Sequence, residues 1–423
     1  MTPSPATTEI GNRVRWVIIL ALLYCACLVT LGPTVQFSQW YIGPDNNQAA
    51  AEAEAWLDGR LTLPGRGGDT ALYNGQVYNI FPPLLTVICF VYYGATSWLN
   101  DGMPLVFFTP LYVLIVAAPI PLLAYYAFRR SGADTLWAAV LAFYAIAGTC
   151  LWPVAGMLGG NAAMVGDNRA AWIYSIQHIL AQTGLAIILI DLLGRRRMWL
   201  AGLGLLIATW SRQTCFLYCL PILWIAWNQP QRRRALILAA IPVAITIALP
   251  AGLNWSKFGN PLETGYRHIF DVDNPNRRIV LGADGDVHLF GLGHVPGHAK
   301  EMFLVPPQIF TTHQGLRITG WGPRTALWYG SPLFLFALID ARRWWRDSVR
   351  RVLMLATIPV IFVGLMWHGP IEGSSGYYRY TLDYSLIWMA AITPWTTGPT
   401  RRWIVLACLA WSVFYFYSIS GNP

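Results

Sequence analysis

The sequence is poor in charge. Only 12% of its 423 residues are Asp, Glu, Lys or Arg, and 55% are hydrophobic. A soluble domain carries about 25% charged residues. Half that fraction, combined with long apolar runs, argues against a soluble globular protein and predicts that most of the surface faces lipid.

Cysteine patterns that bind metal or carry redox chemistry are also lacking. The seven cysteines all lie in apolar stretches, and none has the spacing and polar company of a zinc or redox site. They are expected to be small buried apolar residues. No metal-ligand set and no cofactor is predicted, although the sequence leaves the use of a divalent metal open. Neither end carries a long polar tail, so a single membrane domain, residues 1–423, is expected.

The net charge of +9 does not indicate nucleic-acid binding. The basic residues fall in short clusters between apolar runs, which is the pattern of membrane topology and not of a basic binding face. The first apolar run, Trp16–Pro33, follows Arg13 and Arg15 and has no small-residue cleavage site followed by a polar domain. It is therefore predicted to be a retained first helix, not a signal peptide.

Apolar runs along the whole chain predict an all-α polytopic membrane protein with about eleven transmembrane helices. They lie at about 16–33, 104–128, 135–156, 172–193, 199–210, 214–228, 235–253, 326–340, 352–367, 383–396 and 403–420. With the N-terminus inside, 17 of the 29 basic residues and 5 acidic ones fall on the inner side, and 12 basic and 15 acidic residues fall outside. This split follows the positive-inside rule.

One apolar stretch, Phe81–Leu99, must not cross the membrane if this topology holds. If it did, Arg129, Arg130 and every later arginine cluster would move to the outer side. We therefore expect a re-entrant or interfacial helix, which begins after Pro82-Pro83 because proline suits a helix N-terminus. Such a segment persists at membrane depth only where it packs on protein or lines a cavity.

Polar residues concentrate in two long outer segments, at about 34–99 and 254–325. In the first, an amphipathic surface helix is predicted over Gln48–Leu61, and Asn74-Gly75 predicts a tight hairpin. In the second, Val295–Val305 predicts another surface helix. Asp45 precedes the first of these helices, where it could act as a helix N-cap or as a catalyst, and the residues alone favour neither.

Further polar residues lie at the outer ends of predicted spans. Arg212 stands at an outer turn, and a lone arginine in so apolar a setting usually has a partner or an anion. His178 opens the outer end of its helix, where a hydrogen-bonded interfacial histidine is the plainer interpretation. A last polar run, Trp367–Asp383, contains Arg379 and Tyr380.

The order of these elements resembles the C-type (GT-C) superfamily of integral-membrane glycosyltransferases, in particular its bacterial protein-mannosyltransferase-like or arabinosyltransferase-like branch. The resemblance covers nearly the whole chain. It rests on Asp45 after the first helix, the surface helix Ala49–Leu61, Tyr78-Asn79-Ile80-Phe81-Pro82-Pro83-Leu84, Ser211-Arg212, Lys257-Phe258-Gly259-Asn260-Pro261-Leu262-Glu263-Thr264-Gly265-Tyr266 and Gly376-Tyr377-Tyr378-Arg379-Tyr380. The sequence departs from the family at Asn46, where many members carry a second acidic residue.

The resemblance implies transfer of a sugar from a polyprenyl-phosphate donor to a glycan, lipid or protein acceptor, at the periplasmic or exterior face of a bacterial inner membrane. An acceptor hydroxyl needs a base, and a leaving phosphate needs cationic donors. The implied roles are Asp45 as catalytic base; Arg212, Arg267, Arg379, Lys257 and His178 as donor-phosphate ligands; and Asp69, Tyr78, Glu263, Tyr266 and Tyr380 as substrate-binding residues.

Two other classes remain open. A lipid-glycan transporter or flippase predicts inverted repeats and charges at the bilayer midplane, neither of which the sequence shows. A polysaccharide ligase or polymerase also takes lipid-linked donors, but usually depends on arginines without a carboxylate base in the first loop. Replacement of Asp45 by Asn separates these classes from the transferase, because only the transferase should lose turnover.

Overall fold

A computed structural model provides the structure of the protein. It describes residues 19, 41–42, 44, 47–66, 70–99, 107–108, 119–152, 171–270, 288–312, 315–319, 325–367 and 379–420. Most of these residues are helical, as predicted. The described strands form three two-stranded antiparallel sheets.

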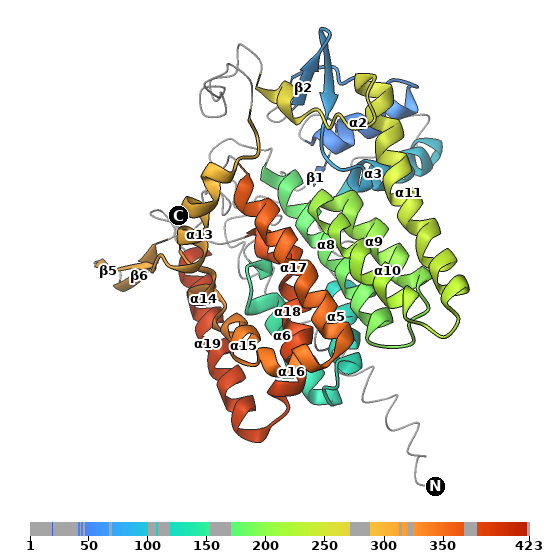
Figure 1. The fold of residues 1–423 in the computed structure, drawn as a ribbon. Coiled ribbons are helices and arrows are strands. Elements are labelled where there is room, and N and C mark those ends of the chain that lie inside the picture. Colours follow the sequence, from blue (N-terminus) through green and yellow to red (C-terminus); the bar gives the residue numbers. More distant parts are fainter. Residues whose placement is uncertain are drawn as a thin grey trace.

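The main body is a bundle of helices (Figure 1). It contains α5 (Pro119–Arg130), α6 (Thr135–Ala147), α8 (Ala171–Leu192), α9 (Trp199–Ser211), α10 (Cys219–Trp227), α11 (Arg232–Phe258), α17 (Ser348–Met366), α18 (Ser385–Thr396) and α19 (Pro399–Ser420). Nine predicted apolar runs overlap these helices. The run at 326–340 is instead broken into α14 (Leu327–Gly330), a 3-10 turn η6 (Pro332–Phe334) and α15 (Leu335–Ile339).

Two of the described helices, α11 and α17, are long and apolar enough to cross a membrane. Shorter apolar helices among the described residues include Thr135–Ala147, Ile176–Leu192 and Trp199–Ser211, of which the last packs on α11. Most of α11 is not buried by the rest of the chain, and it exposes Ile237 and Ile241. An apolar helix face of this kind is typical of contact with lipid.

Small residues bring three of these helices close together. A Cβ atom on Gly184 of α8 would lie 2.4 Å from the carbonyl oxygen of Gly204 on α9. A Cβ on Gly202 would lie 2.6 Å from Pro242 of α11. Small residues at such positions let helix backbones approach, which is a common basis of helix association in membranes.

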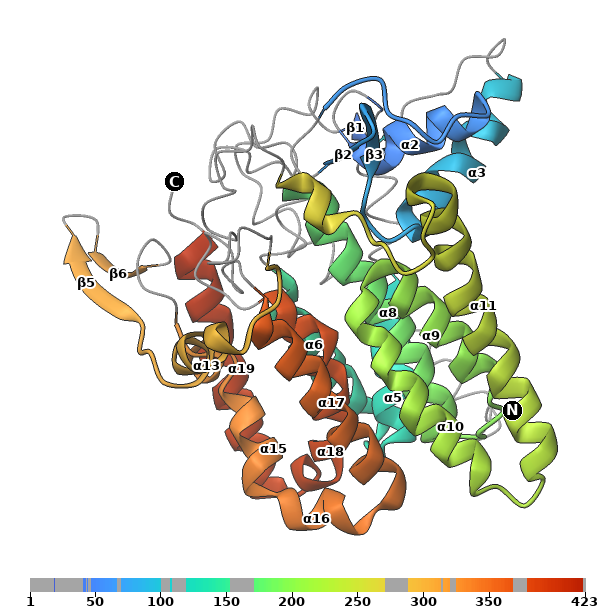
Figure 2. The ribbon, with the colours of Figure 1, turned by 45° about the horizontal axis from the view of Figure 1, so that its top comes forward.

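The arginine-bearing turns lie together at one end of the bundle (Figures 1 and 2). Arg402 at the start of α19 pairs with Asp134 at the start of α6. Arg350 on α17 donates from Nη2 to the carbonyl of Ser131 at 2.9 Å. The turn between α10 and α11 reaches the turn between α8 and α9, because Gln229 Nε2 lies 3.0 Å from the carbonyl oxygen of Arg196.

The first polar segment forms a small layer at the opposite end. It consists of α2 (Gln48–Leu57), the hairpin of β2 (Thr70–Tyr73) and β3 (Gln76–Asn79), and α3 (Leu84–Leu99). The hairpin turns at Asn74-Gly75 with positive φ at both residues, which confirms the predicted tight turn. Helix α2 ends four residues earlier than predicted. Its N-cap is Asn47, whose side chain accepts from the amides of Ala49 and Ala50, so Asp45 is not the cap.

The surface helix expected at Val295–Val305 is α13 (Val295–Phe303), which packs on α17. A short strand pair, β1 (Tyr41–Ile42) with β4 (Phe107–Phe108), and the hairpin of β5 (Gln308–Thr312) with β6 (Gly315–Thr319) complete the described strands. Helix α3 begins directly after Pro82-Pro83 and lies beside α2, away from the arginine-bearing end (Figure 2).

Candidate functional site

A buried polar network centres on Asp383, whose side chain is 3% exposed. Both of its carboxylate oxygens accept from Nε of Arg212 at 3.3 Å, and Oδ2 also accepts from Nη2 at 3.2 Å. Thr214 donates its hydroxyl to Oδ2 at 2.9 Å, and Nδ1 of His178 lies 3.1 Å from Oδ1. Three elements distant in sequence therefore meet at one carboxylate.

Breaks in the helices place these groups. Helix α9 ends at Ser211, and Arg212 adopts an extended backbone before the 3-10 helix η3 (Gln213–Tyr218) begins. Asp383 ends a second 3-10 helix, η8 (Arg379–Asp383), which directly precedes α18. The phenol of Tyr218 donates to the backbone carbonyl of Asp383 at 2.8 Å. Gln182 of α8 donates to the carbonyl of Leu382, so η8 is fixed from two sides.

Two guanidinium groups share the ring of Tyr380. That of Arg212 lies 4.8 Å from the ring centroid and that of Arg379 lies 5.5 Å from it. The edge of His178 packs against the same ring at 5.5 Å. Two guanidinium groups thus meet at one ring beside the Asp383 carboxylate.

Arg212 remains charged at this position. Burial acts to lower the pKa of Arg212, but the Asp383 carboxylate more than offsets this and holds the pKa above its ordinary value. The phenol of Tyr266 is also near enough to raise it, which places the second outer segment beside this network. An arginine oriented by a carboxylate keeps its remaining N–H donors available in a fixed direction, the geometry that favours binding of phosphate.

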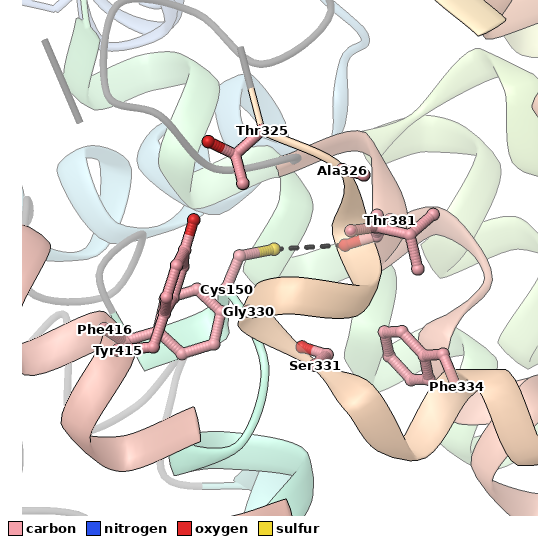
Figure 3. Close-up of a pocket in the computed structure, with 10 residues that line it drawn as sticks. Cys150, Thr325, Ala326, Gly330, Ser331, Phe334, Thr381, Tyr415 and Phe416 are labelled. Atoms are coloured by element: carbon pink, nitrogen blue, oxygen red, sulfur yellow. Dashed lines mark hydrogen bonds between the residues drawn. The ribbon is translucent and has the colours of Figure 1, made fainter. Parts of the chain in front are cut away.

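Two small cavities flank η8. One adjoins the network and is lined by Thr214, Met302, Val360, Ile361, Gly364, Leu365, Tyr380, Asp383 and Tyr384. The other is lined by Cys150 and Thr381, whose sulfur and oxygen lie 3.2 Å apart (Figure 3). Tyr415 and Phe416 of α19 and Ser331 line it further (Figure 3). Neither cavity contains a basic side chain in its lining.

A second buried network joins the small layer of the first polar segment, called the outer layer below, to α11. Glu52 of α2, which is 1% exposed, pairs with Lys257 near the end of α11. Its other oxygen accepts from Nδ2 of Asn79 and from the hydroxyl of Thr86, both at 2.7 Å. Lys257 also donates to the carbonyl of Asn79 at 2.8 Å. One ion pair thus ties α2, β3, α3 and α11 together. We call these four side chains the Glu52 network.

A third group forms around Phe258. Tyr78 packs edge-on against Phe258 with ring centroids 5.4 Å apart. Glu263 pairs with Arg267 at 2.6 Å. Tyr266, in the 3-10 helix η4 (Tyr266–Ile269), packs against Trp367 at 5.6 Å. Burial raises the pKa of Tyr78, so this phenol stays protonated.

The residues predicted for the site therefore divide into three groups. Arg212, Arg379, His178 and Tyr380 come together around Asp383, and Tyr266 lies nearby. Lys257 belongs to the Glu52 network, while Tyr78, Glu263 and Arg267 lie around Phe258 and η4. Asp45 and Asp69 fall outside the described residues. Within the described ranges, no three His, Cys, Asp or Glu side chains gather closely enough to hold a metal.

No role for Asp383, Thr214 or Glu52 was predicted from the sequence. The one available signal for Asp383 was the expectation that Arg212 needs a partner. Comparison with known proteins adds no further assignment, since no family model, curated protein or solved structure matches this chain.

Proposed function

We propose that the chain is a multi-pass membrane glycosyltransferase that transfers a sugar from a polyprenyl-phosphate donor to an acceptor on the non-cytoplasmic face. The observation that carries this proposal is the convergence of Arg212 and Arg379 on Tyr380, with Arg212 oriented by the buried Asp383. Guanidinium groups held in place in this way suit a leaving group that gains negative charge as it departs.

The arrangement of charge along the bundle supports the proposed topology. The arginine-bearing turns contact one another at one end, as Arg350 with Ser131 and Arg402 with Asp134 illustrate. The Glu52 network and the first-segment layer lie at the other end (Figure 1). In a membrane, the positive-inside rule assigns the arginine-bearing end to the cytoplasm. The candidate site then stands toward the outer boundary, where a lipid-linked donor is accessible.

The proposed reaction is a single displacement. The acceptor hydroxyl oxygen attacks the anomeric carbon of the donor sugar, and a new C–O bond forms as the bond between that carbon and the phosphate oxygen breaks. Asp45 takes the hydroxyl proton as the proposed base. Polyprenyl phosphate leaves with the electron pair, and Arg212 and Arg379 stabilise its charge. Attack opposite to the leaving group inverts the anomeric configuration.

The experiment measures release of polyprenyl phosphate by mass spectrometry, from purified protein in lipid nanodiscs given a panel of polyprenyl-phosphate sugars. Wild type should release it from one donor class. Asp45→Asn should lower turnover by roughly 10²-fold or more while the donor still binds. Arg212→Gln should lower it by about 10²- to 10³-fold, as loss of a charge-stabilising donor does.

The matched control is Arg60→Gln, which removes one exposed arginine, paired with Asp58, from the same outer segment. It should leave turnover unchanged. If the protein is a flippase or a ligase, Asp45→Asn should leave its activity nearly unchanged. The transferase proposal would be refuted if no donor released polyprenyl phosphate while wild type and Asp45→Asn bound the donors equally well.

A further inference from the structure

At the arginine-bearing end of the bundle, arginine side chains repeatedly stack on tryptophan rings. The structure describes four pairs in which an arginine guanidinium lies over an indole ring: Arg232 over Trp227 at 4.5 Å, Arg402 over Trp137 at 5.1 Å, Arg401 over Trp395 at 5.3 Å and Arg351 over Trp345 at 5.8 Å. All four lie at this end. The two described arginines over Tyr380 lie at the candidate site instead.

Exposed tryptophans also lie beside the arginine clusters. Each of four arginine clusters has one within a few residues: Trp199 (45% exposed) follows 195–197, Trp227 (57%) precedes 232–234, Trp345 (49%) lies within 342–346, and Trp403 (74%) follows 401–402. Indoles prefer the boundary between hydrocarbon and headgroups. These four rings therefore indicate where the lipid headgroups lie along the bundle axis.

The basic residues at this end are all arginine. The 17 basic residues assigned to the inner side include no lysine, and the two lysines of the chain, Lys257 and Lys300, lie in the outer segments. A rule based on charge alone would accept either residue. Arginine differs because its planar group stacks on an aromatic face and still presents N–H donors at its edge in the geometry of a phosphate.

We propose that the Arg–Trp pairs at this end form a binding surface for the phosphate groups of anionic phospholipids in the cytoplasmic leaflet. In each pair the indole covers the face of the guanidinium. Arg402 also pairs with Asp134, and Nη1 of Arg351 and of Arg401 donates to the carbonyl of the same tryptophan. We therefore assign the remaining N–H donors of Arg232, Arg351 and Arg401 to the headgroup phosphates. Acidic neighbours do not cancel the charge, because only Asp134, Asp191, Asp340 and Asp347 accompany fifteen arginines among the described residues here. The proposal requires membrane insertion but not glycosyl transfer.

The test measures the preference for phosphatidylglycerol over phosphatidylcholine, from the lipids retained on the intact protein in native mass spectrometry. Wild type should prefer the anionic lipid, and the preference should fall as ionic strength rises. The double variant Arg351→Gln/Arg401→Gln should lose roughly fivefold of that preference for each arginine removed. At equal ionic strength, inorganic phosphate should displace no more lipid than chloride does, and greater displacement by phosphate would overturn the assignment to a lipid surface.

The matched control, Arg60→Gln/Arg66→Gln, removes the same charge from the outer segment and should leave the preference unchanged. Arg351→Lys/Arg401→Lys keeps the charge and should still lose part of the preference, because lysine neither stacks nor binds bidentately in the same way. Full retention by the lysine variant, or by the glutamine variant, would overturn the proposal. The salt dependence is measured on wild type, so it still tests the proposal if a variant fails to fold.

Discussion

Replacement of Asp383 by Asn should destabilise the protein chiefly by leaving Arg212 without its counter-charge. Asp383 accepts hydrogen bonds from Arg212 and Thr214 and lies 3.1 Å from His178, and its side chain is 3% exposed. Removal of one partner from a buried ion pair costs about 3–5 kcal/mol, because the other charge remains buried and uncompensated. The Arg212 side chain is 15% exposed, so the lower figure of about 3 kcal/mol is expected.

A double-mutant cycle isolates the pair. Arg212→Gln should also be destabilising, because it leaves the Asp383 carboxylate with only His178 and Thr214 as described side-chain partners. The double variant Asp383→Asn/Arg212→Gln carries no uncompensated charge, and should be about 2–3 kcal/mol more stable than the sum of the single effects predicts. Thr214→Val is the control for loss of one hydrogen bond to the carboxylate and should cost about 1.5 kcal/mol.

The assay is unfolding by titration with a denaturing detergent, followed by tryptophan fluorescence in a fixed mild detergent without substrate. No donor is present, so the result does not depend on the proposed reaction. Single effects that add within about 0.5 kcal/mol would show that the two residues do not interact, and the reasoning from burial and distance would then fail.

Three further predictions concern other parts of the chain. Glu52→Gln should increase hydrogen exchange in α2 and α3, measured by mass spectrometry, because it leaves the Lys257 ammonium buried without its counter-charge. Burial acts to raise the pKa of Asp134, but hydrogen bonds from the Trp137 amide and from Arg402 outweigh burial, so the pKa lies below its ordinary value. The contribution of Asp134 to stability is therefore present above about pH 4 and is lost as pH falls. Asp134→Asn should remove this part of the acid dependence of thermal unfolding. Gly75→Ala should cost about 1 kcal/mol because its φ is +74°, whereas Gly65→Ala, where φ is not positive and no atom is near, should be neutral.

Periodicity and length were sufficient to predict most of the helices. The long apolar run that became α11 was predicted from residue 235, and the structure begins the helix at Arg232. The hairpin at Asn74-Gly75 and the start of α3 after Pro82-Pro83 followed from the local preferences of Gly and Pro. These features depend on residues close in sequence, which is why sequence alone could predict them.

The interior of the outer layer could not be predicted in the same way. The α2 segment was predicted to be an amphipathic helix on the membrane surface. In the structure its alanines, including Ala50 and Ala53, are buried, Glu52 is buried among them, and Leu57 is exposed. Small alanines permit close packing against α3, and the burial of a glutamate is possible only because Lys257 arrives from α11. The partner is 205 residues distant, so no local pattern reveals it.

The candidate site shows the same limit. The sequence placed Arg212 at a turn and predicted a partner or an anion for it, but the partner lies 171 residues away in a polar run with two acids, Glu372 and Asp383. Tyr380 was chosen by resemblance, whereas its position between Arg212 and Arg379 depends on how η8 lies against α9 and η3. Residues that tertiary packing brings together have no characteristic spacing in the sequence, so a single sequence does not reveal the contact.

Helix α11 connects the two ends on which the proposals depend. Its 27 residues span about 40 Å at the rise of an α-helix, which approaches the thickness of a bilayer with its headgroups. It begins at Arg232, whose guanidinium covers Trp227, and Lys257 near its other end closes the Glu52 network. One helix of bilayer length therefore has an arginine–tryptophan pair at one end, which suits a headgroup phosphate. At its other end it has the ion pair that holds the outer layer. If the first end lies in the cytoplasmic headgroups, the second must lie at the opposite boundary, where the proposed chemistry requires the outer layer to be.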